Sequence, residues 1–506
     1  MADVRPFKCC RPAPEVAAEV AALPYDVFSR EEAAAEIARH PKSFLRIDKT
    51  TALLPKEISE YDPQVYSLAY ELFNKDIHDG IFLNEDISAY YIYRLIKQGR
   101  AQTAIIACVS VDEYKSGVIK RHENTRAHKK QDRIDHILAL GAQSSPVFLA
   151  YRPIACLSQL LIKCMNEATP LYDFCSPDAV SHSVWRIAEP DVVAQIQEAF
   201  AGVDALYIAD GHHRAAAAVT VSEQLAAKAE QQQYSVTEQQ QYAGVKLQQC
   251  AELEQQCSEA RHFLAALFSA DELMIHGYNR VVAGMGNNTP KQLLQKIGET
   301  FTVQKLPLCK EAEGLSNNTQ PCHCGHDTQS AGLLSKTVDQ EKDDNEFFGY
   351  KPTQRGQIAM YIANDNGEND LRDASDKGTN ANNAGDANAN AGSWYLLSIP
   401  EALRSKDPVD GLDVAILHEH LIAPILGITD PKSDSRISYV GGVRGLKFLQ
   451  ERANKQNGVA FALFPVTLEE LFAVADANRL MPPKSTWFDP KPLSGLFLHK
   501  IKKSDN

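Results

Sequence analysis

Residues 205–230, ALYIADGHHRAAAAVTVSEQLAAKAE, pass from an apolar run through an Asp-Gly turn into an alanine-rich segment. The apolar run is typical of a buried strand, and alanine has the highest intrinsic helix propensity. The glycine between the two segments lets the backbone turn sharply. The sequence therefore predicts one strand-turn-helix unit centred on Gly211.

The predicted turn gathers groups that bind anions. Backbone N–H groups in the first turn of a helix have no partner within the helix. Arg214 can hold a phosphate through two parallel hydrogen bonds, His212 and His213 can donate hydrogen bonds, and Gly211 lets the backbone approach a ligand. Asp210 can orient a hydroxyl group or hold Mg²⁺. We therefore predict a phosphate or nucleotide site here, although such short motifs also occur as ordinary polar turns.

Outward from this unit, helices and strands alternate along the whole chain. Residues 29–41 predict a helix with Ser29 as N-cap and Glu32 as its capping-box partner. Residues 81–117 predict two adjacent strands, because aromatic and β-branched residues dominate them. Further helices are predicted at 132–141, closed by a glycine, and at 412–428. The predicted class is α/β, in the sense of a mixed α+β protein.

Three polar stretches interrupt this pattern. The Gln-rich stretch near 229–257 can extend the preceding helix, and a polar stretch near 308–345 is expected at the surface. The Asn/Asp/Gly-rich stretch near 363–393 is too polar to offset its ordering entropy, so it is predicted to be a disordered loop. The predicted parts are an N-terminal α/β part at 1–222, a Gln-rich helical insertion at 223–262, a middle α/β part at 263–362, the loop at 363–393, and a C-terminal α/β part at 394–506.

The composition narrows the class of function. The 506 residues include 65 acidic and 52 basic side chains, a net charge of −13, which argues against a protein that coats DNA. No segment approaches the ~18 consecutive apolar residues needed to cross a bilayer, so we expect no membrane partner and a cytoplasmic location. Several of the 11 cysteines lie inside apolar runs, where a disulfide scaffold is not expected. The composition gives no indication of the oligomeric state.

A second group of chemically varied side chains lies in GVIKRHENTRAHKKQDR at 117–133. It is not a zinc protease motif, because HExxH needs a histidine at position 126, which is Arg126 here. A solvated helix start and a substrate- or phosphate-binding segment both explain it. The candidate side chains are His122, Glu123, Thr125, Lys129, Asp132 and Arg133.

Two further motifs carry weaker signals. PKST at 483–486 lacks the glycines of a P-loop, but Lys484 and the nearby Lys491 can neutralise a substrate phosphate or carboxylate if the loop is not simply a proline-braced turn. The tight cluster of cysteines and histidines at 322–326 has no second pair at suitable spacing, which makes it a weak zinc signal. We therefore assign no metal ion, apart from Mg²⁺ at Asp210.

Several of these blocks, taken in order, are familiar. The blocks are VRPF at 4–7, LPYDV with SREEA at 23–33, HExTxxxKxxDR at 122–133, ADGHHR at 209–214, YNRVV at 278–282, and MPPKSTWFDPK with SGL at 481–496. In this order they resemble a large conserved family of uncharacterised proteins, sometimes labelled ParB-like or SpoOJ-like. The resemblance runs from Arg5 to Ile501, outside the polar insertions.

The DGHHR block is similar to the phosphate-binding turn of the ParB and sulfiredoxin superfamily, which includes free serine kinases, CTP-using partition proteins and sulfiredoxin. The resemblance implies a ParB/sulfiredoxin-like strand-turn-helix phosphate site within a larger mixed-sheet protein. It places Gly211, His212, His213 and Arg214 at the phosphate and makes Asp210 a catalytic carboxylate.

The resemblance leaves the second catalytic carboxylate open between Asp26 and Glu123. His212 stands where sulfiredoxin has its nucleophilic cysteine, which disfavours reduction of sulfinic acids. DNA partition is disfavoured as well, because the chain is acidic and shows no basic helix-turn-helix.

Members of the resembled family are often encoded beside enzymes that make phosphoserine. This implies a phosphotransferase acting on a small hydroxy amino acid, either a free serine kinase that uses Mg²⁺ and ATP or ADP, or a phosphoserine phosphatase. Lys129, Arg133 or Lys484 would then bind the carboxylate of the amino acid. The alternative is a non-catalytic, nucleotide-binding ParB-like switch. The expected partners are an amino acid and a nucleotide.

Overall fold

The computed structural model describes residues 2–237, 243–307, 350–364 and 392–502. The chain forms two compact units, of which the first contains Met1–Met274 and Pro490–Asn506 and the second contains Ile275–Asp489. The first unit thus takes in both the N-terminal half and the C-terminal end of the chain. The five-part division expected from the sequence has other boundaries and stays a prediction.

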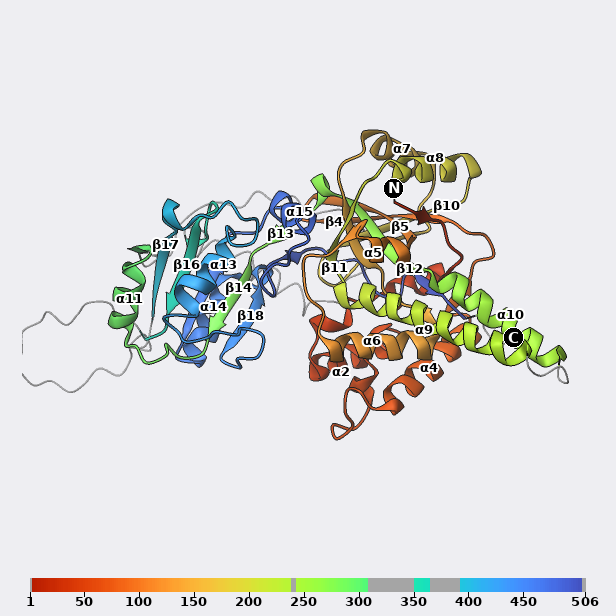
Figure 1. The fold of residues 1–506 in the computed structure, drawn as a ribbon, viewed down its shortest axis with the longest axis horizontal. Helices are drawn as coiled ribbons and strands as arrows, with labels where there is room; N and C mark the ends of the chain where they lie inside the picture. The colour runs from red at the N-terminus through yellow and green to blue at the C-terminus, as the bar shows by residue number, and fades with distance from the viewer. Residues whose placement is uncertain (1, 238–242, 308–349, 365–391, 503–506) are drawn as a thin grey trace, which may run out of the picture. The chain divides into compact units, whose positions relative to one another are not determined.

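A nine-stranded mixed sheet forms the centre of the first unit (Figure 1). Its order is β6-β11-β8-β12-β5-β4-β10-β9, with β1 paired to β5. The β6–β11 and β8–β12 pairs are parallel, and the other pairs are antiparallel. The strands are β1 (Val4–Arg5), β4 (Tyr90–Lys97), β5 (Arg100–Ser110), β6 (Ile119–Lys120), β8 (Val147–Tyr151), β9 (Tyr172–Cys175), β10 (Ser181–Ile187), β11 (Leu206–Asp210) and β12 (His262–Ser269).

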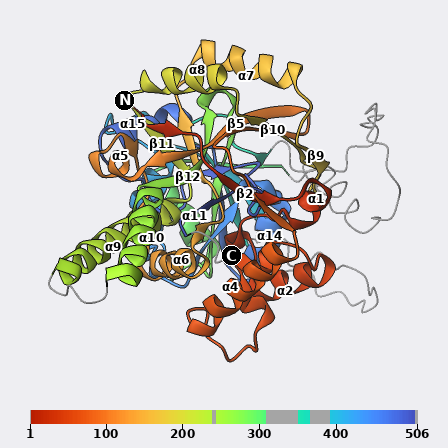
Figure 2. The same cartoon turned by 90° about the vertical axis from the view of Figure 1, so that its right-hand side faces the viewer.

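Side chains of α7, α8 and α9 share one hydrophobic core with the same face of this sheet, and α6 packs against α9 (Figures 1 and 2). Ala215 and Ala218 of α9 pack into the sheet core, while Ala217 and Val221 pack against α6. Small side chains on both flanks let α9 fit between the sheet and α6. The helices of the unit include α4 (Pro63–His78), α5 (Val111–Ser116), α6 (Ala127–Leu140), α7 (Ala155–Glu167), α8 (Pro190–Ala201), α9 (His212–Thr237) and α10 (Ala243–Ala260).

A second, four-stranded sheet joins the two ends of the chain. Its order is β3-β2-β21-β7, and Cys9 pairs with His499. Buried side chains of α2, α3 and α4 form a separate core with this sheet. The elements of this region are β2 (Cys9–Pro12), η1 (Pro14–Val16), α1 (Ala17–Val20), η2 (Tyr25–Val27), α2 (Arg30–Arg39), α3 (Leu45–Asp48), η3 (Thr50–Leu53), β3 (Phe82–Asn84), β7 (Ala142–Gln143) and β21 (Leu498–Lys500).

The second unit is built on a six-stranded antiparallel sheet of order β15-β17-β16-β19-β14-β18. A two-stranded sheet, β13-β20, belongs to the same unit. The elements are β13 (Ile275–His276), β14 (Tyr278–Val282), α11 (Pro290–Gly298), β15 (Thr302–Lys305), β16 (Gln357–Ile362), β17 (Ser393–Ser398), α13 (Asp413–Leu417), η7 (His418–Ile422), β18 (Ile437–Gly441), α14 (Gly445–Lys455), β19 (Val459–Leu463), α15 (Leu468–Asp476) and β20 (Trp487–Phe488).

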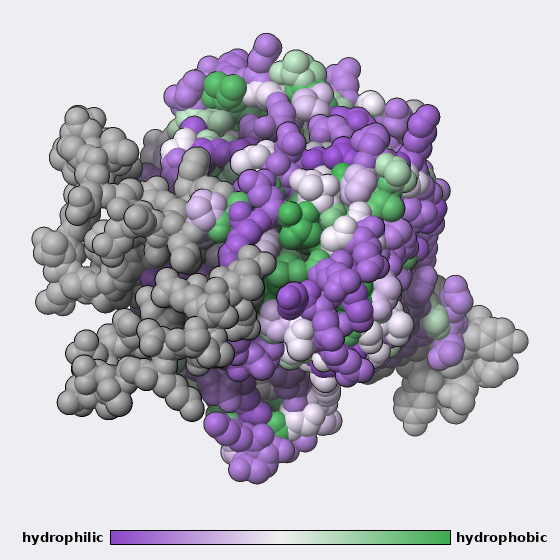
Figure 3. Space-filling view, turned by 90° about the vertical axis from the view of Figure 1, so that its left-hand side faces the viewer, coloured by the Kyte–Doolittle hydropathy of each residue, from purple (hydrophilic) through white to green (hydrophobic). Residues whose placement is uncertain are grey.

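The face of the molecule shown in Figure 3 is mainly hydrophilic, as expected when the apolar side chains are buried in the cores. Hydrophobic residues appear there as small, separate groups. None of the described helices is both long and apolar enough to cross a membrane. The cysteines with described side chains are free thiols.

The mixed α/β class and several local predictions are confirmed. Ser29 and Glu32 form the predicted capping box of α2, and β4 pairs with β5. The predicted strand is β11 and the predicted helix is α9. Gly211, between them, has a φ of 90°, as expected for a sharp turn. The predicted helix at 132–141 begins earlier, at Ala127, and ends at a left-handed glycine as expected.

The structure differs from the sequence-based expectation in two helical regions. The helix predicted at 412–428 is wrong in length: α13 passes into the π-helical turn η7, because Pro424 has no N–H with which to continue the ladder. The Gln-rich stretch lies mostly in two helices, α9 and α10, rather than in one extension. The cluster at 322–326 and nearly all of the polar stretches at 308–345 and 363–393 lie outside the described residues.

The chain returns to the first unit at Pro490, and the conformation of this C-terminal return segment (490–502) depends on Gly495. Its φ is 81°, and a Cβ atom there would lie 2.5 Å from Cβ of the buried Phe44. Gly80 has a similar φ of 75° but open space around it. We expect Gly80→Ala to lower the free energy of unfolding by roughly 1 kcal/mol through backbone strain alone, and Gly495→Ala by a further ~1–3 kcal/mol through overpacking. Urea unfolding of both variants and the wild type measures the difference, and equal losses would contradict the packing shown here.

Candidate functional site

The two motif-bearing loops of the first unit meet because their strands are parallel neighbours. Leu206 of β11 pairs with Ile119 of β6, and Tyr207 pairs with Lys120. The carboxyl ends of adjacent parallel strands lie at the same edge of a sheet, where ligands commonly bind in α/β proteins. The loop at 121–126 and the turn at Gly211 therefore lie side by side, although about ninety residues separate them in the sequence.

Asp210 is the centre of an ion cluster at this edge. Its Oδ2 lies 3.0 Å from Nζ of Lys491 and 3.5 Å from Nη2 of Arg214. Only 11 % of the Lys491 side chain is exposed. Burial opposes the charged form of Lys491, but the carboxylates of Asp210 and Asp26 outweigh this effect and raise its pKa above the ordinary value. The site thus holds a carboxylate between two cations.

Arg214 lies directly under the glycine of the turn. Its Nη1 donates a hydrogen bond to the carbonyl oxygen of Pro146. A Cβ atom at Gly211 would lie 3.0 Å from Nε of Arg214. The positive φ and the close guanidinium together explain why glycine is needed at this position.

The three histidines fasten the loop at 121–126 to the start of α9. The rings of His122 and His212 are edge-on, with centroids 4.6 Å apart, and Nδ1 of His212 lies 3.9 Å from Oε2 of Glu123. Burial and then the neighbouring His212 lower the pKa of His122 to about 3. Nε2 of His213 accepts a hydrogen bond from the backbone N–H of Arg126 at 2.9 Å. At this nitrogen His213 is an acceptor, not the donor expected from the sequence.

The two candidate cations of α6, Arg133 and Lys129, point in different directions. Arg133 is buried, with Nη2 2.8 Å from Oδ2 of Asp132 and its guanidinium 3.9 Å from the centroid of the Tyr25 ring. Lys129 is partly exposed, and its Nζ lies 3.6 Å from Oε2 of Glu60. Arg133 is therefore the cation of this helix that faces the interior.

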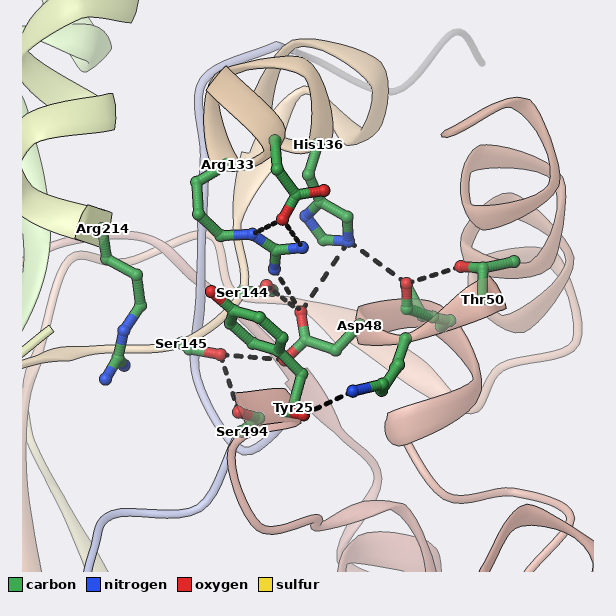
Figure 4. Close-up of polar contacts among 12 residues, drawn as sticks. Tyr25, Asp48, Thr50, Arg133, His136, Ser144, Ser145, Arg214 and Ser494 are labelled. Carbon is green, nitrogen blue, oxygen red and sulfur yellow. Dashed lines mark hydrogen bonds and ion pairs between the residues drawn. The ribbon is translucent and has the colours of Figure 1, made fainter. Parts of the chain in front are cut away.

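Beside Arg133 lies a buried polar network that the sequence did not reveal (Figure 4). Ser144 and Ser145 donate hydrogen bonds of 3.0 and 3.1 Å to the two carboxylate oxygens of Asp48. The hydroxyl groups of Ser145 and Ser494 are 2.7 Å apart. Nε2 of His136 lies 3.7 Å from Asp48 Oδ1, and burial followed by the charge of Arg133 lowers the pKa of His136. The network joins four segments of the first unit.

The remaining predicted residues fall into two groups. Asp26, in η2, is exposed, and Thr125 is half-buried in the loop between β6 and α6. Lys484 belongs to the second unit, where its φ is 57° and its Nζ lies 5.6 Å from the centroid of the Tyr278 ring. There Arg280 donates a hydrogen bond of 3.2 Å to the carbonyl oxygen of Lys484.

Sequence reasoning named Asp210, Arg214 and Arg133 but did not predict which side chains they contact. Lys491 was named as a residue that can neutralise a substrate phosphate or carboxylate, but its contact with Asp210 was not predicted, and Asp48 carried no motif at all. Among the described residues, no group of three or more His, Cys, Asp or Glu side chains is arranged to hold a metal ion. With Asp210 engaged by two cations, the described side chains do not build a resident Mg²⁺ site.

Comparison with known proteins identifies the family. Residues 4–415 match the family described as "Protein of unknown function (DUF1015)", which covers most of the chain. The chain therefore belongs to the DUF1015 family. No curated protein matches the sequence.

Three solved structures illustrate how distant the structural relatives are. A free serine kinase in complex with AMP is 11 % identical, with a TM-score of 0.27, over 76 % of this chain and 86 % of that one. SbnI with a C-terminal truncation, from Staphylococcus aureus, is 11 % identical, with a TM-score of 0.31, over 79 % and 90 %. A conserved hypothetical protein from Pyrococcus furiosus is 12 % identical, with a TM-score of 0.26, over 76 % and 90 %. The ParB-like and SpoOJ-like labels stay predictions.

The buried His122 has a measurable consequence for stability. Its pKa is about 3 in the folded protein and about 6.5 when unfolded, so between these values the unfolded chain binds a proton that the folded protein does not. Stability from this residue is complete above pH ~6.5 and falls as the pH decreases. We expect His122→Gln to reduce the slope of unfolding free energy against pH by up to ~1.4 kcal/mol per pH unit.

The measurement is urea unfolding at several pH values between 5 and 7.5. His78→Gln is the matched control, because the His78 side chain is 91 % exposed. An unchanged slope in His122→Gln would show that His122 is not held neutral in the folded protein.

Proposed function

We propose that this protein is a phosphotransferase acting on a small hydroxy amino acid, either a nucleotide-dependent kinase of L-serine or a phosphatase of O-phosphoserine. One observation carries the proposal: the carboxylate of Asp210 is held between Lys491 and Arg214 at the N-terminus of α9. Phosphoryl transfer needs cations and N–H donors around the transferring oxygens and a carboxylate beside the attacking hydroxyl. This turn supplies all three.

Each group has a distinct role in this proposal. Arg214, Lys491 and the backbone N–H groups of the first turn of α9 stabilise the charge of the phosphoryl group. In a kinase Asp210 orients the serine hydroxyl that attacks, and in a phosphatase it orients the water molecule that hydrolyses phosphoserine. Lys491 is influenced by both Asp210 and Asp26, which favours Asp26 as the second carboxylate. Glu123 instead lies beside His212 and helps to fix the loop.

The nucleotide would be ATP or ADP. Since the described side chains do not build a metal site of their own, Mg²⁺ is expected to arrive bound to the nucleotide phosphates. Such a reaction draws on the nucleotide and amino-acid pools of the cytoplasm, which is the location we propose.

Phosphorus NMR on the purified protein with Mg²⁺ tests the reaction and its direction. One tube holds L-serine with ATP or ADP, and a second holds O-phosphoserine alone. Phosphoserine formed in the first tube supports a kinase, and inorganic phosphate released in the second supports a phosphatase. Nucleotide binding without product in either tube would contradict the proposal and favour a non-catalytic, nucleotide-binding switch.

The variant Asp210→Asn tests whether Asp210 takes part in catalysis or only in a nucleotide-binding site. The amide keeps the shape of the carboxylate but cannot accept a proton, so we expect turnover to fall by roughly 10²–10⁴-fold while nucleotide binding persists. Asp191→Asn, on an exposed position of α8, is the control and should keep full turnover. Full turnover by Asp210→Asn would remove Asp210 from the mechanism.

A further inference from the structure

We propose that a small cavity between Arg133 and Arg214 receives the carboxylate group of the hydroxy-acid substrate. This inference rests on the proposed function, because it names the part of the substrate that the first unit recognises. The cavity has a volume of about 30 Å³, and its polar lining includes Arg133, His136, Ser144, Ser145 and Arg214 (Figure 4).

The cation on the inner side of the cavity has hydrogen-bonding capacity left. Asp132 engages Nε and Nη2 of Arg133, at 2.9 and 2.8 Å. Nη1 lies 3.7 Å from Asp48 Oδ1, which is too far for a hydrogen bond. The two oxygens of that carboxylate accept hydrogen bonds from Ser144 and Ser145. Burying an arginine donor is costly unless a partner completes it. A ligand oxygen in the cavity is a suitable partner.

The size of the cavity limits what can enter it. A volume of about 30 Å³ admits roughly two water molecules, and hence the two oxygen atoms of a carboxylate. A nucleoside is far too large. Guanidinium groups match the planar geometry of a carboxylate, which they commonly bind through two hydrogen bonds.

Arg214 connects this cavity to the reacting end of the site. Its side chain lines the cavity, and its Nη2 lies 3.5 Å from the Asp210 carboxylate. A carboxylate held at Arg214 therefore lies within a short carbon spacer of any hydroxyl group placed at Asp210. This arrangement selects a small hydroxy acid, in which the carboxylate and the hydroxyl lie close together, as in serine.

Binding of three small molecules tests which group is recognised. Isothermal titration calorimetry with L-serine, 3-hydroxypropanoate and ethanolamine, each with and without ADP, compares ligands with and without a carboxylate. We expect L-serine and 3-hydroxypropanoate to bind and ethanolamine not to bind. If ethanolamine binds as tightly as L-serine, or if neither carboxylate binds, the inference is wrong.

Two variants test the cavity itself. Arg133→Gln removes the buried cation and should weaken L-serine binding at least tenfold while leaving ADP binding unchanged. Ala218→Val keeps every charge and fills the cavity from α9, because Ala218 also lines it, and should weaken L-serine binding as well. Ala218→Val keeps the test decisive if Arg133→Gln does not fold.

Arg46→Gln is the control for loss of a buried arginine. Arg46 is paired with the buried Asp76 but does not line the cavity. L-serine binding should be unchanged in this variant, and a loss equal to that of Arg133→Gln would show a general effect on folding and overturn the inference.

Failure of the inference is distinguishable from failure of the proposed function. L-serine binding that depends on Arg133 and Ala218, without turnover in the NMR tubes, would uphold the carboxylate subsite and remove the phosphotransferase. Turnover of L-serine that neither variant affects would uphold the phosphotransferase and remove the carboxylate subsite.

Discussion

The first unit is organised around the charge of Asp48, a carboxylate that is almost completely removed from solvent. A buried charge is costly unless hydrogen bonds and a counter-charge complete it. Asp48 obtains these partners from α6, from residues 144 and 145 and, through Ser145, from Ser494. These partners come from distant parts of the sequence, so the chain must close on itself before the charge is satisfied. The Asp48 network thereby fixes the segments that form the site.

One consequence reaches the cluster around Asp210. The hydroxyl of Ser494 is hydrogen-bonded to that of Ser145, and the backbone of Ser494 forms an antiparallel β-bridge with Ala22. These two contacts hold the return segment of the chain in place. Lys491 lies three residues before Ser494 and is held against Asp210. The same network sets Arg133 under the ring of Tyr25, next to Asp26. Asp48 thus helps to position Lys491 beside Asp210 and Arg133 beside Tyr25, although it contacts neither Lys491 nor Asp210.

Features that depend on neighbours in the sequence could be predicted from the sequence, and features that depend on distant pairing could not. The capping box of Ser29 and the turn at Gly211 follow from local backbone chemistry. The contact of Asp210 with Lys491 joins residues 281 positions apart and depends on the sheet order. His213 illustrates the same limit, because its role follows from the backbone N–H of Arg126, which no local pattern indicates.

The balance of charge at Asp210 bears on how the site would respond to a phosphate. Lys491 and Arg214 neutralise the carboxylate, and both side chains are largely shielded from solvent. An incoming phosphate oxygen competes with Asp210 for these cations, because it accepts the same charge-assisted hydrogen bonds. A carboxylate that loses part of its cation contacts becomes a better acceptor for a hydroxyl proton. Under the proposed function, phosphate binding would therefore itself prepare Asp210 for its role.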